Sequence, residues 1–179
     1  MSGAGARHLV LVGMMGAGKS TVGRRCAQRL QRAFVDTDEV IETIAGASVA
    51  EVFARDGEPA FRELERTAVA DACASPVPAV IAVGGGAVLD PENRRRLRAA
   101  GLVVWLCAPV DELARRVGDT ASRPLLAGDA EGALRRLDAL RRPAYEAAAH
   151  ATVDTGEASV DAVVDAVLTT FDATAECAS

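Results

Sequence analysis

Short apolar runs alternate along the chain with longer segments of helical periodicity. The runs cover residues 8–12, 33–36, 79–83, 102–107 and 151–154. Runs that stay apolar without alternating with polar positions are typical of strands in a parallel sheet with both faces covered. Because helical segments separate the runs, we expect right-handed crossovers and an α/β fold with a doubly wound parallel sheet.

Polar residues mark several of the expected helix starts. Ser48 and Glu51 have the spacing of a capping box, in which each side chain satisfies a backbone N–H of the other residue. Asp90 precedes Pro91 as a cap precedes the first helical residue, and Ser159 is placed to cap a last helix. These signals support the division into strands and helices.

Two regions depart from this alternation. Residues 38–74 read as mostly helical and are too long for one crossover, so we expect a helical region inserted over an edge of the sheet. Residues 118–130 are rich in glycine, aspartate and alanine, which favours a long surface loop able to act as a lid. We therefore expect one domain over residues 1–179, with a core of residues 8–37, 75–117 and 131–172.

Composition narrows the class of protein. The 179 residues suffice for one α/β domain, and since 50% are hydrophobic but only 3% aromatic, the core must consist of alanine, valine and leucine. A net charge of −5 disfavours nucleic-acid binding, and the basic residues at 94–98 favour a solvated helix face. No apolar run approaches the roughly 18 residues of a membrane span. Four cysteines without metal or redox spacing fit a reducing cytosol, so we expect a cytoplasmic protein. We expect a monomer, because no leftover apolar element demands a partner, and we expect no contact with nucleic acid or membrane.

The strongest chemical signal follows the first apolar run. Residues 13–21 read Gly-Met-Met-Gly-Ala-Gly-Lys-Ser-Thr between an expected strand and an expected helix, which is the spacing and context of a phosphate-binding P-loop. Its glycines let backbone N–H groups surround phosphate oxygens at the start of a helix. Because Lys19 can reach the β- and γ-phosphates and Ser20 can bind Mg²⁺, the chain is predicted to bind a nucleoside triphosphate.

Two carboxylates follow the second apolar run, at the end of a strand, where ligands gather in sheets of this kind. Asp36 could hold Mg²⁺ through water, and Asp38 could orient or deprotonate a substrate hydroxyl for attack on the γ-phosphate. The alternative is that Asp38 only caps the following helix. The position beside the P-loop favours the functional interpretation.

Three glycines follow the third apolar run. Gly84, Gly85 and Gly86 each cost backbone entropy, which the close approach of a small ligand would justify. The alternative is a simple turn into the helix that begins at Pro91.

Arginines are candidates for binding anions. Arg62 lies three residues before Glu65 on an expected helix, so the two can pair and fix a guanidinium for bidentate binding of a carboxylate. Either Arg141 or Arg142 could face the site, where Pro143 is expected to end or interrupt a helix.

Two further arginines belong to the lid region. Arg116 lies on the helix before the lid and could stack on a purine base. Arg123 within the lid could close over phosphates and neutralise charge that develops there. Taken alone, each is also explained as a solvated surface charge.

Together these motifs resemble the shikimate kinase family. The matching segments are the P-loop, residues 36–38, Phe61 and Arg62 with Glu65, residues 84–87, residues 123–126, and Arg141-x-Pro-x-Tyr145. The resemblance implies a P-loop, nucleoside-monophosphate-kinase-like fold with a five-stranded parallel sheet flanked by helices, an inserted substrate-binding region and a lid loop. It also implies transfer of the ATP γ-phosphoryl group to the 3-hydroxyl of shikimate, in the pathway to chorismate and the aromatic amino acids.

The resemblance implies a role for each matching position. The implied catalytic residues are Lys19, Asp38 and Arg123, and the implied ligands of Mg²⁺ are Ser20 and Asp36. The residues implied in binding ATP are Gly16, Ala17, Gly18, Lys19, Ser20, Thr21, Arg116 and Arg123. Those implied in binding shikimate are Asp38, Arg62, Gly84, Gly85, Gly86 and Arg141, with the two arginines on its carboxylate.

Three alternatives are weaker. Another small-molecule kinase of this fold, such as gluconate kinase, would share the P-loop but should not need both Arg62 and Arg141. A GTPase-type switch is disfavoured because the sequence lacks an Asn-Lys-x-Asp guanine motif. A nucleotide-binding module without catalysis is disfavoured because all the catalytic positions are filled.

Overall fold

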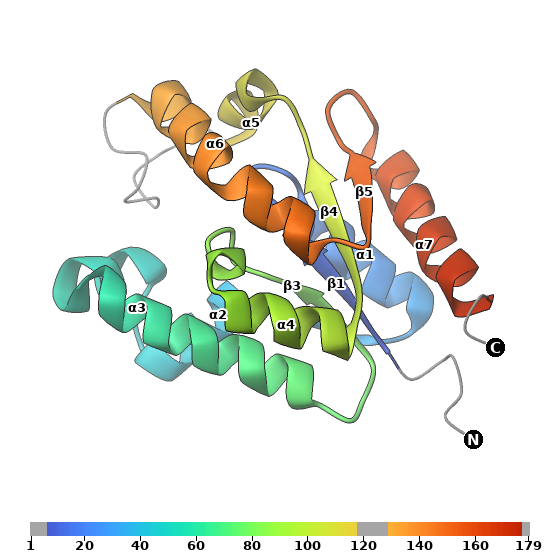
Figure 1. The fold of residues 1–179 in the computed structure, drawn as a ribbon, viewed down its shortest axis with the longest axis horizontal. Helices are drawn as coiled ribbons and strands as arrows, with labels where there is room; N and C mark the ends of the chain where they lie inside the picture. The colour runs from blue at the N-terminus through green and yellow to red at the C-terminus, as the bar shows by residue number, and fades with distance from the viewer. Residues whose placement is uncertain (1–6, 118–128, 177–179) are drawn as a thin grey trace.

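The fold is built on a parallel β-sheet, seen in a computed structural model that describes residues 7–117 and 129–176. The strands are β1 (His8–Val12), β2 (Ala33–Asp36), β3 (Ala79–Ala82), β4 (Gly101–Cys107) and β5 (Ala151–Asp154). They form one five-stranded sheet in the order β2-β3-β1-β4-β5, with every neighbouring pair parallel (Figure 1). The prediction of a doubly wound parallel sheet is confirmed.

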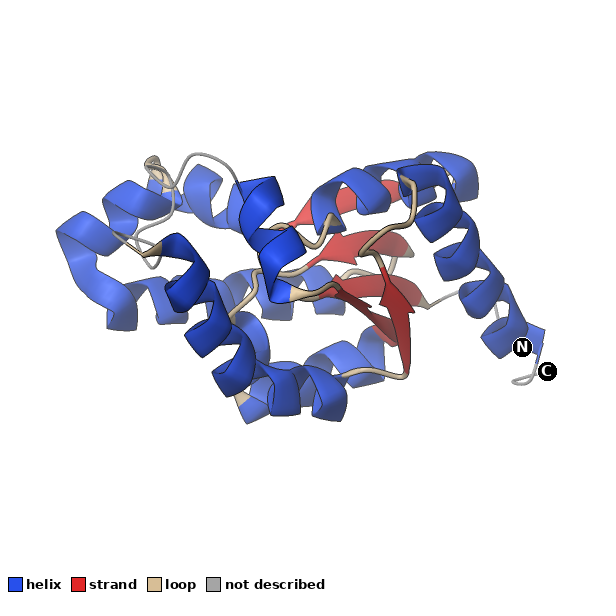
Figure 2. Ribbon diagram, turned by 90° about the horizontal axis from the view of Figure 1, so that it is seen from above, coloured by secondary structure: helices blue, strands red, loops and turns tan. Residues whose placement is uncertain are grey.

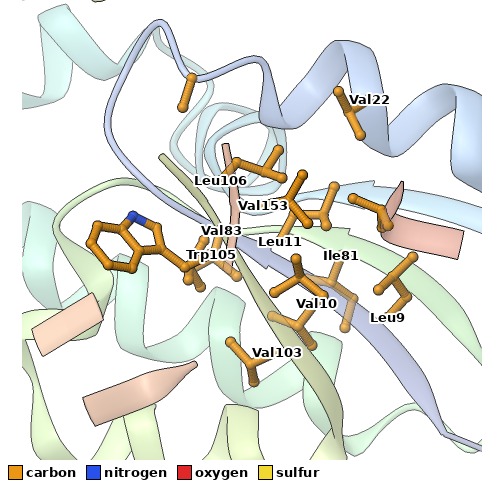
Figure 3. Packing of buried hydrophobic residues seen from close by; sticks show 14 of the residues in the cluster. Leu9, Val10, Leu11, Val22, Ile81, Val83, Val103, Trp105, Leu106 and Val153 are labelled. Atoms are coloured by element: carbon orange, nitrogen blue, oxygen red, sulfur yellow. The ribbon is translucent and has the colours of Figure 1, made fainter. Parts of the chain in front are cut away.

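Helices cover both faces of the sheet (Figure 2). On one face α1 (Lys19–Leu30) packs against α7 (Val160–Glu176), and on the other α4 (Pro91–Ala100) packs against α6 (Ala130–Ala148). Because both faces are covered, residues 9–12 of the central strand β1 are fully buried. Figure 3 shows apolar side chains of β1, β3 and β4 packed together with Val22 of α1.

The order of the strands brings three sequence motifs to one edge of the sheet. Parallel strands end at the same edge, and β3 lies between β1 and β2. The P-loop follows β1, the Asp-Thr-Asp segment follows β2, and the glycine turn follows β3. The Val83 N–H donates to the Leu11 carbonyl over 3.0 Å, which continues the pairing of β1 and β3 up to these loops.

The segment between β2 and β3 is mostly helical, as its sequence predicts. It contains α2 (Thr37–Ala45), which contacts β2, and α3 (Val49–Ala74), which packs against α2 and runs beside α4 (Figure 1). Helix α3 is kinked at Gly57, where φ is 81° and ψ is 172°. The half of α3 after the kink lies beside α4. There Arg66 forms an ion pair of 3.2 Å with Asp90, the residue directly before α4. Two short helices, η1 (Ala87–Leu89) and α5 (Val110–Val117), complete the described elements.

The predicted helix caps are present. Ser48 N–H donates to Glu51 Oε2 over 2.7 Å, and Glu51 N–H donates to Ser48 Oγ over 3.3 Å, so both bonds of the capping box form. Asp90 caps α4, and Ser159 Oγ accepts from the Ala162 N–H over 3.2 Å at the start of α7. These helices therefore begin where the polar signals of the sequence place them.

Helix α6 continues through Pro143, so the prediction that the proline ends or interrupts a helix is wrong. Proline removes one backbone hydrogen bond and costs about 3 kcal/mol in a helix interior. Beyond it, Tyr145 and Ala148 are fully buried, and fully burying a large apolar side chain contributes about 1.5–3 kcal/mol. Burial of this last turn against the sheet offsets the cost, so the helix persists to Ala148.

The predicted lid, residues 118–130, falls mostly outside the described residues, and Arg123 lies outside them altogether. Its last two residues are described, and Asp129 is the N-cap of α6, accepting from the Gly132 N–H over 2.9 Å. Within residues 7–117 and 129–176, every helix is too short or too polar to cross a bilayer.

Candidate active site

A cleft of about 770 Å³ opens where the P-loop, the Asp-Thr-Asp segment and the glycine turn meet. It is lined by every predicted site residue that the structure describes. These residues are Gly16, Ala17, Gly18, Lys19, Ser20, Thr21, Asp36, Asp38, Arg62, Gly84, Gly85, Gly86, Arg116 and Arg141. The cleft therefore joins motifs that lie more than a hundred residues apart in the sequence.

The P-loop ends at a helix N-terminus that faces the cleft. Gly16 and Gly18 have φ angles of 83° and 91°, which residues with side chains rarely adopt. Gly18 is the N-cap of α1, with no side-chain cap and no acidic residue in the first turn. The backbone N–H groups of that turn and the helix dipole are consequently available to an anion such as phosphate.

Lys19 folds back over the P-loop. Its Nζ donates to the Gly13 carbonyl over 2.8 Å and to the Met14 carbonyl over 3.0 Å. These bonds hold the ammonium beside the loop whose N–H groups would surround phosphates. A cation in this position can neutralise charge on a β- or γ-phosphate.

Ser20 and Asp36 form a direct pair at the start of α1. Ser20 Oγ donates to Asp36 Oδ2 over 2.6 Å. The other oxygen, Asp36 Oδ1, accepts from the Asp38 N–H over 3.1 Å, which makes Asp36 the N-cap of α2. The capping role considered for Asp38 thus belongs to Asp36.

The oxygen pair of Ser20 and Asp36 fits Mg²⁺. In residues 7–117 and 129–176, no three side chains of histidine, cysteine, aspartate or glutamate are grouped as a metal cage. Mg²⁺ in kinases is usually held by one or two protein oxygens together with waters and substrate phosphates, so two such ligands suffice.

Asp38 and Glu65 lie together against the glycine turn. A Cβ placed on Gly84 would be 2.7 Å from Asp38 Oδ1 and 3.1 Å from Glu65 Oε1. Burial raises the pKa of the Glu65 carboxyl, and the charge of Asp38 adds to this shift while Arg62 and Arg141 oppose it. The two carboxylates and two guanidinium groups therefore form one charged cluster at the turn.

Arg62 is held by carboxylates on its own helix. Its Nη1 forms an ion pair of 2.7 Å with Glu65, and its Nη2 forms one of 2.9 Å with Glu58. The predicted pair of Arg62 and Glu65 is therefore present, with the Glu65 side chain only 3% exposed. The guanidinium lies against Gly86, where a Cβ would be 2.5 Å from Nη1.

Arg141 and Arg142, although adjacent, have different surroundings. Arg141 is 2% exposed and lines the cleft, and its Nε has no hydrogen-bond partner in the part of the chain that the structure describes. Arg142 forms an ion pair of 2.8 Å with Asp138 and lies over the Trp105 ring, outside the cleft lining. The helix thus turns Arg141 toward the site and Arg142 away from it.

Arg116 is engaged with the loop that follows β5. It forms an ion pair of 2.7 Å with Glu112, and its guanidinium donates to Thr155 Oγ1 over 3.2 Å and to the Gly156 carbonyl over 2.6 Å. Its edges are occupied by these bonds, so stacking through its face is the way it can contact a base.

The three glycines are explained by the side chains around them. Asp38 fills the space beside Gly84, Arg141 Nη1 would be 3.1 Å from a Cβ on Gly85, and Arg62 fills the space beside Gly86. The turn therefore lacks side chains because the charged groups of the site occupy their positions.

The contacts of Asp38 with Gly84 and of Arg62 with Gly86 predict different effects for two alanine substitutions. Gly84→Ala displaces the Asp38 carboxylate and is expected to lower kcat, whereas Gly86→Ala displaces the Arg62 guanidinium and is expected to raise the acceptor KM. Because misplacement by about 1 Å can cost on the order of 100-fold, each effect is expected at about 10–100-fold. Steady-state kinetics of the two variants check the split, and identical changes in kcat and KM for both would contradict it.

The cleft also has an apolar wall that the sequence did not predict as part of the site. Val49, Phe53 and Phe61 form an apolar wall with the Phe53 and Phe61 rings 4.5 Å apart, and Glu42 lies nearby. Of these, only Phe61 was noted, as part of a motif. The helical spacing of Val49, Val52 and Phe53 signals an apolar face. Val52 is fully buried while Phe53 lines the cleft, because neighbouring residues of a helix with 3.6 residues per turn point in different directions.

Known proteins resemble this chain over almost its whole length. A family model described as Shikimate kinase matches residues 15–172. The shikimate kinase of Symbiobacterium thermophilum is 48% identical over 164 residues, covering 90% of this chain and 94% of that protein. The solved structure of shikimate kinase from Acinetobacter baumannii in complex with shikimate has a TM-score of 0.90 at 35% identity, covering 94% of both chains. A gluconokinase from Sinorhizobium meliloti has a TM-score of 0.58 at 16% identity, a likeness that extends to the fold alone.

Proposed function

Since this chain belongs to the shikimate kinase family, we propose that its cleft binds ATP along the P-loop and shikimate between the glycine turn and α3. The chain is an ATP-dependent kinase that transfers the γ-phosphoryl group to the 3-hydroxyl of shikimate, yielding shikimate 3-phosphate and ADP for the synthesis of aromatic amino acids.

The main support for a shikimate site in this cleft is the buried guanidinium of Arg141. A cation that is 2% exposed, with a buried Nε that lacks a partner among the described residues, favours an anionic ligand. Arg62 supplies a second guanidinium, fixed by Glu65, on the other side of the glycine turn. Two fixed guanidinium groups suit the carboxylate of shikimate.

Phosphoryl transfer is assigned to the residues that meet at the turn. Asp38 accepts the hydrogen bond of the attacking hydroxyl and takes its proton as the new bond to the γ-phosphorus forms. The bond from the γ-phosphorus to the oxygen that bridges it to the β-phosphate breaks, and ADP leaves with that oxygen. Lys19 and the N–H groups at the start of α1 stabilise the negative charge of the phosphates. When bound, Mg²⁺ would be held by Ser20 and Asp36 and would neutralise charge shared by the β- and γ-phosphates. Arg123, which lies outside the described residues, keeps its predicted role of closing over the phosphates.

We also propose the oligomeric state and cellular location of the enzyme. The substrates are the small molecules ATP and shikimate, and the described residues of a single chain line the cleft for both, which is compatible with action as a monomer. The net charge of −5 disfavours nucleic acid as a further partner. The free thiols of Cys26, Cys73 and Cys107 and the use of ATP support a cytoplasmic location.

The adjacent arginines of α6 offer a matched test of the acceptor site. Arg141→Met is expected to raise the shikimate KM about 100-fold, because a buried charge pair with the substrate carboxylate is lost. Arg142→Met removes an ion pair whose arginine is 45% exposed, so its KM is expected to stay within about twofold. In both variants the ATP KM should be unchanged. Equal effects of the two substitutions on the shikimate KM would remove Arg141 from the carboxylate site.

A further inference from the structure

Two buried hydroxyl groups hold the glycine turn from different elements. Thr37 Oγ1 accepts from the Gly84 N–H over 2.9 Å, and the Tyr145 hydroxyl donates to the Gly85 carbonyl over 2.6 Å. Both residues are fully buried. Thr37 begins α2 and Tyr145 lies in α6, so the turn is tied to both the inserted helices and the core.

We propose that Thr37 and Tyr145 are positioning residues, which fix the glycine turn so that Asp38 and Arg141 keep their places around the acceptor. The inference rests on the proposed function, because it concerns the shikimate half of that same cleft.

The bond from Thr37 joins the two segments that set the position of Asp38. Thr37 lies directly before Asp38, and Gly84 is the residue against which Asp38 Oδ1 packs. A buried N–H without a partner is costly, so loss of the hydroxyl would shift the turn or the start of α2. Either shift moves the Asp38 carboxylate relative to the reacting hydroxyl, which affects kcat.

The bond from Tyr145 acts in the same way on Arg141. Arg141 and Tyr145 are four residues apart on α6 and therefore on one face of the helix, which requires that the helix continue through Pro143. The Tyr145 ring stacks on Trp105 with centroids 5.6 Å apart, which limits its movement. A Cβ on Gly85 would be 3.1 Å from Arg141 Nη1 and 3.5 Å from the Tyr145 hydroxyl. Releasing the Gly85 carbonyl therefore disturbs the contact between the turn and Arg141, which affects the shikimate KM.

Conservative variants distinguish positioning from mere support of the fold. Thr37→Val keeps the shape of the side chain but removes the hydroxyl oxygen that accepts the Gly84 N–H. We expect its kcat to fall about tenfold with the ATP KM unchanged. The kcat of Thr37→Ser, which keeps the hydroxyl, is expected to stay within about twofold of the wild-type value. Tyr145→Phe is expected to raise the shikimate KM about tenfold, again without a change in the ATP KM. Thr43→Val is the matched control, since the Thr43 hydroxyl donates to the Glu39 carbonyl on an exposed part of the same helix.

The outcomes separate this inference from the proposed function. Wild-type kinetic constants in both Thr37→Val and Tyr145→Phe would overturn the inference. A loss of kcat in Thr37→Ser equal to that in Thr37→Val would also overturn it. So would a rise in the ATP KM of Thr37→Val or Tyr145→Phe that matches the change in its other kinetic constant. If Thr37→Val fails to fold, Thr37→Ala measured against Thr37→Ser decides in the same way, because only the serine variant keeps the hydroxyl. Failure of the wild-type protein to phosphorylate shikimate would instead reject the proposed function.

Discussion

Replacing Asp38 by asparagine is expected to lower kcat for shikimate by about 10²–10⁴-fold, the range associated with loss of a positioned general base. The carboxylate lines the cleft beside Gly84, at the ends of β2 and β3, where a hydroxyl of the acceptor would meet the γ-phosphate. Asparagine keeps the size of the side chain and one oxygen but cannot take the proton. The fold should survive, because Asp36 and not Asp38 caps α2.

The measurement is a comparison of kcat, both KM values and the thermal midpoint of Asp38→Asn with those of the wild type. Asp71→Asn on α3 is the control, since Asp71 is exposed, lies outside the cleft lining and is expected to leave kcat unchanged. A near-normal kcat in Asp38→Asn, with shikimate as acceptor, would show that the residue is not the base.

Replacing Lys19 by methionine is expected to lower kcat/KM for ATP by about 10²–10³-fold, as for the loss of one donor to a developing charge. Methionine retains most of the length of the side chain but removes the ammonium that donates to the Gly13 and Met14 carbonyls. Calorimetric binding of shikimate alone should be unaffected, because the acceptor groups belong to other elements. Loss of shikimate binding in Lys19→Met, or unchanged kinetics with ATP, would contradict the assignment.

The sequence also provides a chemical test of Lys19. Its side chain carries the only lysine amine in the chain, so an amine-selective acylating reagent has a single side-chain target. Acylation of Lys19, followed by mass spectrometry of the peptide that contains it, should inactivate the enzyme, and ATP should protect it. Modification that proceeds at the same rate in saturating ATP would place the amine outside the nucleotide site.

The parallel sheet and the cleft were predictable because each depends on local patterns. The apolar runs identify the strands, and the rule that ligands gather at strand ends places the P-loop, Asp36 and Asp38 at one edge of the sheet. Arg62 and the adjacent Arg141 and Arg142 are already candidate anion ligands from local patterns, and the resemblance to a family then implies that Arg62 and Arg141 bind one carboxylate.

Other features required the packed structure. Arg141 and Arg142 are adjacent in sequence, and local pattern alone leaves both as candidates. The resemblance selects Arg141, and the packing of α6 shows that Arg141 lines the cleft while Arg142 lies outside it. The sequence does not say which aspartate caps α2, because Asp36 and Asp38 both stand at the helix start. Thr37 and Tyr145 stand within matched motifs, but the sequence does not show what their hydroxyl groups bind, since each bonds to a backbone atom of a distant turn.

The central claim is that the cleft phosphorylates a small carboxylic acid bearing hydroxyl groups, shikimate, and not an open-chain sugar acid. The most direct test is coupled ADP release by the purified protein with ATP, Mg²⁺ and either shikimate or gluconate, followed by NMR of the product. We expect one ADP for each shikimate consumed, phosphate on the 3-hydroxyl, and no ADP release above background with gluconate. Turnover of gluconate without turnover of shikimate would contradict the account.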